Sequence, residues 1–218
     1  MSRPDRTIVY EGGLFRVEHQ PVKDRTDPYV FVRRVGAVTA LPIIKDASGE
    51  PFVLTIDNNR RYYGMLALSL PSGNVNGGHD NPDTPADTAL RELIEETGYG
   101  YSDPSQQSMD TFTLRTVSNT IDYPRFLVVA RSVEYIGGED HNPAEVIALR
   151  PTPVGEYLDE LLNLRNGRTY PEVNAAFAKA GMECGREAVM AWLVGDKSAP
   201  NAAAVPQSFE PWLLHTHS

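Results

Sequence analysis

Residues 73–99 read GNVNGGHDNPDTPADTALRELIEETGY, and this stretch decides the fold. Its first half is dense in Gly and Pro, so the sequence predicts a long loop without regular structure over residues 71–85. A helix then begins, because Thr84 can cap its first turn and Pro85 suits its first position. Gly98 is a natural stop for that helix. The pattern therefore predicts a helix over Pro85–Thr97.

The predicted helix has a core-facing side and an acidic side. At about 100° per residue, one arc carries the residues expected to face the core, which are Ala86, Leu90, Leu93, Ile94 and Thr97. Glu92, Glu95 and Glu96 lie on the opposite side at spacings of three and four residues. Neighbours at this spacing lie roughly 5–6 Å apart at Cβ, so the three carboxylates repel one another.

Two interpretations of the three glutamates are open. They can form a solvated acidic surface, in which Arg91 softens the repulsion through Glu95 four residues later. Alternatively, divalent cations neutralise the cluster, since carboxylate oxygens suit hard ions such as Mg²⁺ or Mn²⁺. The residues around the helix favour the second interpretation.

Residues 91–98, RELIEETG, resemble the second half of the Nudix box, in which R-E-aliphatic-x-E-E-x-G follows a glycine-led loop. Two glycines can take the leading place. Gly77 keeps the usual spacing, whereas Gly73 follows Pro71-Ser72, which is closer to the family's usual lead, and lengthens the loop. In either alignment Asp83 occupies the place of a glutamate that is largely structural in the family.

The resemblance implies an α/β fold, the Nudix α/β/α sandwich around a mixed sheet, and a hydrolase that cleaves the diphosphate of a nucleoside diphosphate linked to a group X. It implies Mg²⁺ or Mn²⁺ as cofactor, held by Glu92, Glu95, Glu96 and the backbone carbonyl of Ser72, with Glu92 and Glu96 catalytic. Arg91 would orient the glutamates. The cations would screen the substrate's charge and lower the pKa of bound water.

The residue that takes the proton from the attacking water is open. In part of the family it is a glutamate on a loop after the box, and Glu145 fits that position best. Glu139 and Asp140, in the same acidic loop, are the alternatives, and an ordinary loop acid is the competing interpretation of Glu145.

Residues 7–17, TIVYEGGLFRV, resemble the opening of the ADP-ribose pyrophosphatase branch of the family, which implies ADP-ribose or a nucleotide sugar as substrate. In that branch an arginine near the substrate lies where Arg60 does, followed here by Arg61 and Tyr62. Arginine can pair with phosphate and tyrosine can stack on a base, although a surface turn explains these residues equally simply. Ser69 and residues 118–122 depart from the branch's pattern, which weakens the assignment of X.

The chain divides into three segments on composition. Residues 1–28 are expected to form a small β segment, which in the branch that it resembles helps to build a homodimer. Residues 29–195 are expected to form the Nudix domain with C-terminal helices, and residues 196–218 a flexible tail, with docking of its apolar end on the fold or a partner as the alternative. The expected strands are Thr7–Tyr10, Leu14–His19, Tyr29–Arg34, Ala37–Ile44, Phe52–Ile56, Thr111–Val117 and Phe126–Tyr135. The expected C-terminal helices are Val154–Leu164, Val173–Ala180 and Arg186–Val194.

Composition excludes several classes of protein. With 218 residues, 41% hydrophobic and 22% charged, the chain is of ordinary globular composition, and no apolar run is long enough for a membrane span. A net charge of −9 argues against a broad nucleic-acid-binding surface. A single cysteine, Cys184, and no apolar signal core predict a cytoplasmic protein. Two alternatives to a nucleoside diphosphate-X hydrolase stay open: a nucleoside triphosphate pyrophosphohydrolase and a non-catalytic, ligand-sensing Nudix-like module.

Overall fold

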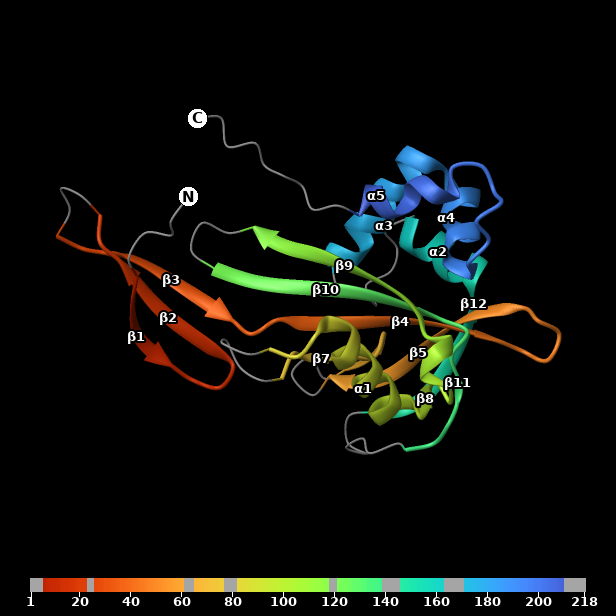
Figure 1. Ribbon diagram of the computed structural model, residues 1–218, viewed down its shortest axis with the longest axis horizontal. Helices are drawn as coiled ribbons and strands as arrows, with labels where there is room; N and C mark the ends of the chain where they lie inside the picture. Colours follow the sequence, from red (N-terminus) through yellow and green to blue (C-terminus); the bar gives the residue numbers. More distant parts are fainter. Residues whose placement is uncertain are drawn as a thin grey trace.

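The computed structural model describes residues 6–22, 26–60, 65–76, 82–117, 121–138, 146–162 and 171–209. A mixed β-sheet forms the middle layer, and helix α1 (Pro85–Thr97) covers one of its faces (Figure 1). The other face is covered by α2 (Val154–Leu162), α3 (Pro171–Cys184), α4 (Arg186–Val194) and α5 (Val205–Ser208). The predicted α/β/α sandwich is confirmed. None of the helices in these ranges is long and apolar enough to cross a membrane.

The main sheet is built around two central strands. Its strands are β1 (Thr7–Glu11), β2 (Phe15–Gln20), β3 (Tyr29–Arg34), β4 (Ala37–Lys45), β5 (Pro51–Arg60), β6 (Met65–Ser69), β7 (Ser72–Asn74), β9 (Ser108–Val117), β10 (Ile121–Arg131) and β12 (Val146–Pro153). The path runs β1-β2-β3-β10-β4-β5-β12, with β6 on β5, β7 on β4 and β9 on β10. Strand β10 runs parallel to β3 and β4, and every other pair is antiparallel.

Smaller elements complete the chain. A separate two-stranded sheet pairs β8 (Tyr99–Gly100) with β11 (Glu134–Tyr135), and two short 3₁₀ helices, η2 (Pro104–Gln106) and η3 (Ala202–Ala204), lie in connections. The hydrogen bond from the Ile136 amide to the Gly98 carbonyl, at 2.8 Å, ties the chain after β11 to the end of α1.

Both faces of the central strands are buried, which explains their nearly continuous apolar sequences. On β4, Val38 and Ala40 pack toward α1, while Leu41 and Ile43 pack toward α2–α5. Strand β10 alternates in the same way: Val128 belongs to the α1 side of the core, and its neighbours Leu127 and Val129 belong to the α2–α5 side.

The ends of α1 follow the predicted signals. The Thr84 hydroxyl accepts a hydrogen bond from the Asp87 amide at 3.1 Å, and Gly98 ends the helix in the left-handed conformation with φ 72°. The buried face differs from the predicted one. It consists of Thr88, Ala89, Leu93 and Thr97, whereas Ala86, Leu90 and Ile94 are only partly buried. The helix is rotated because it packs against both β4 and β7.

The C-terminal prediction is wrong for residues 196–209. Ala202, Val205 and Phe209 are buried in the core with α2–α4, and the Phe209 ring lies 5.2 Å from the Trp192 ring and 5.1 Å from the Phe177 ring. Burying a phenylalanine stabilises by about 2 kcal/mol, which holds this segment on the domain. Residues 210–218, with the rest of the predicted tail, lie outside the described residues.

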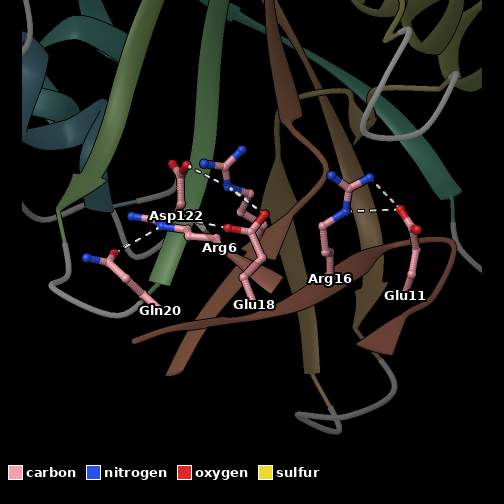
Figure 2. Close-up of polar contacts among 7 residues, drawn as sticks. Arg6, Glu11, Arg16, Glu18, Gln20 and Asp122 are labelled. Atoms are coloured by element: carbon pink, nitrogen blue, oxygen red, sulfur yellow. Dashed lines mark hydrogen bonds and ion pairs between the residues drawn. The ribbon is translucent and has the colours of Figure 1, made fainter. Parts of the chain in front are cut away.

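Strands β1–β3 extend beyond the helical layers (Figure 1) and have two unlike faces. One face is charged: Glu18, which is buried, pairs with Arg6 at 3.2 Å and with Arg33 at 3.4 Å, and Arg16 donates to Glu11 at 3.0 Å (Figure 2). Alternation along the strands places on the other face the apolar side chains of Tyr10, Phe15, Val17, Val30, Val32 and, from β10, Ile121, with His19 and Arg34 toward its two ends. We call this second set the apolar N-terminal face.

Candidate functional site

Strand β7 forms within the segment for which the sequence predicts only loop. Ser72, Gly73 and Asn74 pair antiparallel with residues 37–39 of β4, so main-chain partners on β4 override their low strand propensity. The strand lies against α1, and the Ser72 amide donates a hydrogen bond to Glu96 Oε2 at 3.0 Å. Ser72 and Glu96, separated by 24 residues in the sequence, are thereby brought together.

Gly73 provides the space in which the Glu92 carboxyl group lies. A Cβ atom on residue 73 would be 1.9 Å from Glu92 Oε1 and 2.1 Å from Glu92 Cδ, well inside van der Waals contact. Residue 73 must therefore be glycine for Glu92 to keep its position. This contact favours Gly73 over Gly77 as the leading glycine of the motif; Gly77 lies outside the described residues.

Arg91 binds two of the three glutamates. Its Nη2 lies 2.8 Å from Glu92 Oε1, and its Nη1 lies 2.9 Å from Glu95 Oε2. The pairing with Glu95 is the one predicted from the four-residue spacing, and the pairing with Glu92 was not predicted. Nη2 also donates to the Asn74 carbonyl at 3.4 Å, so Arg91 links the acidic side of α1 to β7.

Burial governs the electrostatics of Glu92. Its side chain is 14% exposed, and burial raises the pKa of this carboxyl group, against the opposing effect of Arg91 and with a smaller contribution from Glu95. Burial thus disfavours the ionised form of Glu92, and the charge of Arg91 only partly offsets this effect. A cation beside it would favour ionisation.

The residues present fit a hard divalent cation. The donors are oxygens only, and Mg²⁺ is commonly held by one or two carboxylates together with water and substrate phosphates. Within the described ranges, no group of three Asp, Glu, His or Cys side chains is already arranged to hold a metal ion. The carboxylates of Glu92 and Glu95 are drawn to Arg91, so a cation would compete with the guanidinium for them.

The remaining predicted site residues are only partly described. Arg60 ends β5, where its backbone pairs with Met65, but its side chain lies outside the described residues. Arg61, Tyr62, Glu139, Asp140 and Glu145 lie outside them altogether. Asp83 is exposed, and its amide donates to the Asn76 carbonyl at 2.9 Å.

Sequence reasoning missed two contributions to this site. The Asn74 carbonyl receives Arg91, and the Gly73 backbone receives Glu92; both depend on β7 lying beside α1. The signal available in the sequence was the glycine at position 73. It lies nineteen residues before Glu92, and no local pattern indicates that Glu92 is buried.

Comparison with known proteins bears on the fold. No protein-family model matches the sequence, and no curated protein matches it as a relative. Among solved structures, the crystal structure of an ADP compounds hydrolase is similar, with a TM-score of 0.51 and 20% sequence identity over 77% of this chain and 82% of that chain. At this identity the likeness establishes that the chain shares the α/β/α fold of that hydrolase.

Proposed function

We propose that the protein is a Nudix hydrolase that cleaves the diphosphate of a nucleoside diphosphate-X substrate, with ADP-ribose or a nucleotide sugar as the first candidate substrates. The observation that carries the proposal is the acidic side of α1 lying against β7, where Glu92 fits over Gly73 and Glu96 accepts from Ser72. The similar fold of an ADP compounds hydrolase supports it.

In the proposed reaction, the chain's own residues position charge. Glu92, Glu95 and Glu96, with the Ser72 carbonyl, would hold Mg²⁺ or Mn²⁺, which supplies a lowered pKa of bound water and screening of the diphosphate. Arg91 would orient the glutamates, since it already joins Glu92, Glu95 and Asn74. Arg60, Arg61 and Tyr62 would bind the substrate through phosphate pairing and base stacking.

A phosphate-release screen tests the proposal. ADP-ribose, nucleotide sugars, dinucleotides and nucleoside triphosphates are each incubated with the full-length protein and Mg²⁺ or Mn²⁺, and products are identified by mass. Monophosphate products from the diphosphate-linked compounds support the proposal. Preferential cleavage of triphosphates would indicate a triphosphate pyrophosphohydrolase instead, and tight binding without cleavage would indicate a ligand-sensing module.

Glu145 is proposed as the base that takes the proton from water. Replacing it (Glu145→Gln) is expected to lower kcat by about a hundredfold, the usual size of a general-base contribution, while metal affinity stays nearly unchanged. Steady-state kinetics and metal titration by calorimetry measure the two quantities. Loss of metal affinity would make Glu145 a ligand, and an unchanged kcat would move the role to Glu139 or back to Glu92. Glu139→Gln and Asp140→Asn serve as matched comparison variants.

We also propose a homodimer formed through the N-terminal β segment, residues 1–28, together with the parts of β3 and β10 that continue its sheet. The apolar N-terminal face leaves Tyr10 52%, Phe15 40%, Val30 45% and Ile121 44% exposed on strands that extend beyond the helices. A small sheet of this kind needs a surface to pack on. A second copy of the chain, related by two-fold symmetry, provides a self-complementary one.

A pair of substitutions tests the dimer. Val30→Glu places a charge on the apolar N-terminal face, opposite His19 of β2, so we expect the dimer dissociation constant to rise at least about tenfold, because a charge would be buried in the interface. Tyr29→Glu, next in sequence, lies on the charged face and serves as the control, since the two residues are 45% and 44% exposed. Sedimentation of the full-length protein measures both. A wild-type monomer at micromolar concentration, or equal effects of the two variants, would contradict this interface.

A further inference from the structure

A cavity of about 520 Å³ lies on the face of the sheet opposite to α1 and its glutamates. It opens to solvent on one side and is lined by the start of β9, the end of β10, the end of α4 and the segment η3–α5. Its volume falls in the range of small-molecule sites, roughly 300–1,000 Å³. The lining residues with polar or aromatic side chains used below are Asp110, Arg131, Trp192, Asp196 and Lys197.

Arg131 is the buried cation of this cavity, with 8% of its surface exposed. Its Nε donates to the Trp192 and Leu193 carbonyls at 3.2 Å and 3.0 Å, and its Nη1 donates to Asp110 Oδ2 at 2.8 Å. The guanidinium carbon lies 5.0 Å from the Trp192 ring centroid. These contacts fix the guanidinium group and leave Nη2 with no hydrogen bond to any described residue.

The charges lining the cavity are not equally satisfied. Asp110 is paired with Arg131, and Asp196 Oδ1 accepts from the amide and hydroxyl of Ser198 at 2.9 Å and 2.6 Å. Lys197 forms no ion pair with a described residue. The Gln107 amide and the Ser108 hydroxyl also line the cavity, and among its cationic groups Arg131 Nη2 and Lys197 Nζ are the donors without a hydrogen-bond partner among the described residues. An anion would satisfy both.

We propose that this cavity binds a small organic phosphate, with the phosphate group between Arg131 and Lys197 and the organic part against Ala203 and Pro206. A carboxylate carries one negative charge on two oxygens that lie close together, so it satisfies one guanidinium edge more readily than two separate cations. A phosphate presents three oxygens, so it can accept separately from Nη2 and from a lysine acting as a point charge. The site is independent of the proposed hydrolase activity.

Binding is tested with a matched pair of probes, phenyl phosphate and benzoate, which share a ring and differ in the anion. Trp192 and Trp212 are the two tryptophans of the chain, so full-length protein with Trp212→Phe reports on Trp192 alone. Binding is followed by the fluorescence emission of Trp192, and calorimetry on the same samples detects binding that leaves this emission unchanged. We expect saturable binding of phenyl phosphate with a dissociation constant on the order of 1 mM or tighter, and about tenfold weaker binding of benzoate.

Two variants and one control locate the site. Lys197→Ala is expected to weaken phenyl phosphate binding about tenfold, the usual effect of one charge-assisted hydrogen bond, and Ala203→Phe is expected to abolish it by filling the cavity. Lys45→Ala removes an exposed lysine at the end of β4 that does not line the cavity, and it is expected to change nothing. No saturable binding by either method, benzoate binding equal to phenyl phosphate, or binding that survives Ala203→Phe would each overturn the proposal.

Discussion

Replacing Glu96 with glutamine (Glu96→Gln) is expected to lower turnover by at least about a hundredfold while the protein stays folded. The variant removes one negative charge from the acidic side of α1, where a divalent cation is proposed to bind. Its amide oxygen can still accept the hydrogen bond from the Ser72 amide, now 3.0 Å from Glu96 Oε2, so β7 and α1 remain joined. One source of repulsion among the glutamates disappears, so the melting temperature should hold or rise. Steady-state kinetics with Mg²⁺ and thermal unfolding measure the two effects.

The control for this variant is Glu187→Gln, the same chemical change in the first turn of α4. The Glu187 side chain is 88% exposed and lies across the sheet from α1, so turnover should not change. Near-normal turnover of Glu96→Gln would show that the acidic side of α1 has no catalytic role. A hundredfold loss accompanied by unfolding would instead reveal a structural role for the contact with Ser72.

The second large effect is expected from Gly73→Ala. The added Cβ would lie 1.9 Å from Glu92 Oε1, so the carboxyl group must leave its place between β7 and Arg91. The clashing atoms are the end of a flexible side chain, so we expect the free energy of unfolding to fall by only about 1 kcal/mol, mainly through the lost contact with Arg91, while kcat falls about a hundredfold because a proposed metal ligand is displaced. Denaturant unfolding and steady-state kinetics measure these quantities.

Two further variants show whether the contact with Glu92 causes the effect. Gly13→Ala meets no atom within 4 Å and should leave stability within about 0.5 kcal/mol of wild type. Combining Gly73→Ala with Glu92→Ala removes the clash, so the double variant should be as stable as Glu92→Ala alone while turnover stays low. A double variant less stable than Glu92→Ala alone would contradict the proposed contact and point to backbone strain in β7.

The helix was predictable because its signals are local. Thr84, Pro85 and Gly98 fix the ends of α1 by capping and backbone geometry, and the periodicity of the sequence placed the three glutamates on one side. The central strands were predictable for a similar reason, since their apolar, β-branched composition is itself a strong signal.

Contacts between segments distant in sequence were not predictable. Strand β7 forms because β4 offers main-chain partners to a segment rich in glycine and proline, and it is β7 that buries Glu92. Phe209 is a further example: its surroundings read as a linker, yet the Phe177 and Trp192 rings hold it in the core. Pairing and packing across the molecule decided these outcomes.

Along strand β10, the side of the sheet that a residue faces depends only on whether its number is odd or even. Its pairing with β9 continues without a bulge from Asp122 to Arg131, so odd and even residues keep their sides along its length. Odd-numbered residues of β10 lie on one side of the sheet: Ile121 belongs to the apolar N-terminal face, and Arg131 lines the cavity. Even-numbered residues lie on the other side: Asp122 belongs to the charged face, and Val128 packs on the α1 side. An insertion or deletion of a single residue here would exchange the two sides beyond it. Insertions or deletions of two residues in β10 keep every side chain on its own side of the sheet. During evolution, the length of this strand is therefore expected to change in steps of two residues.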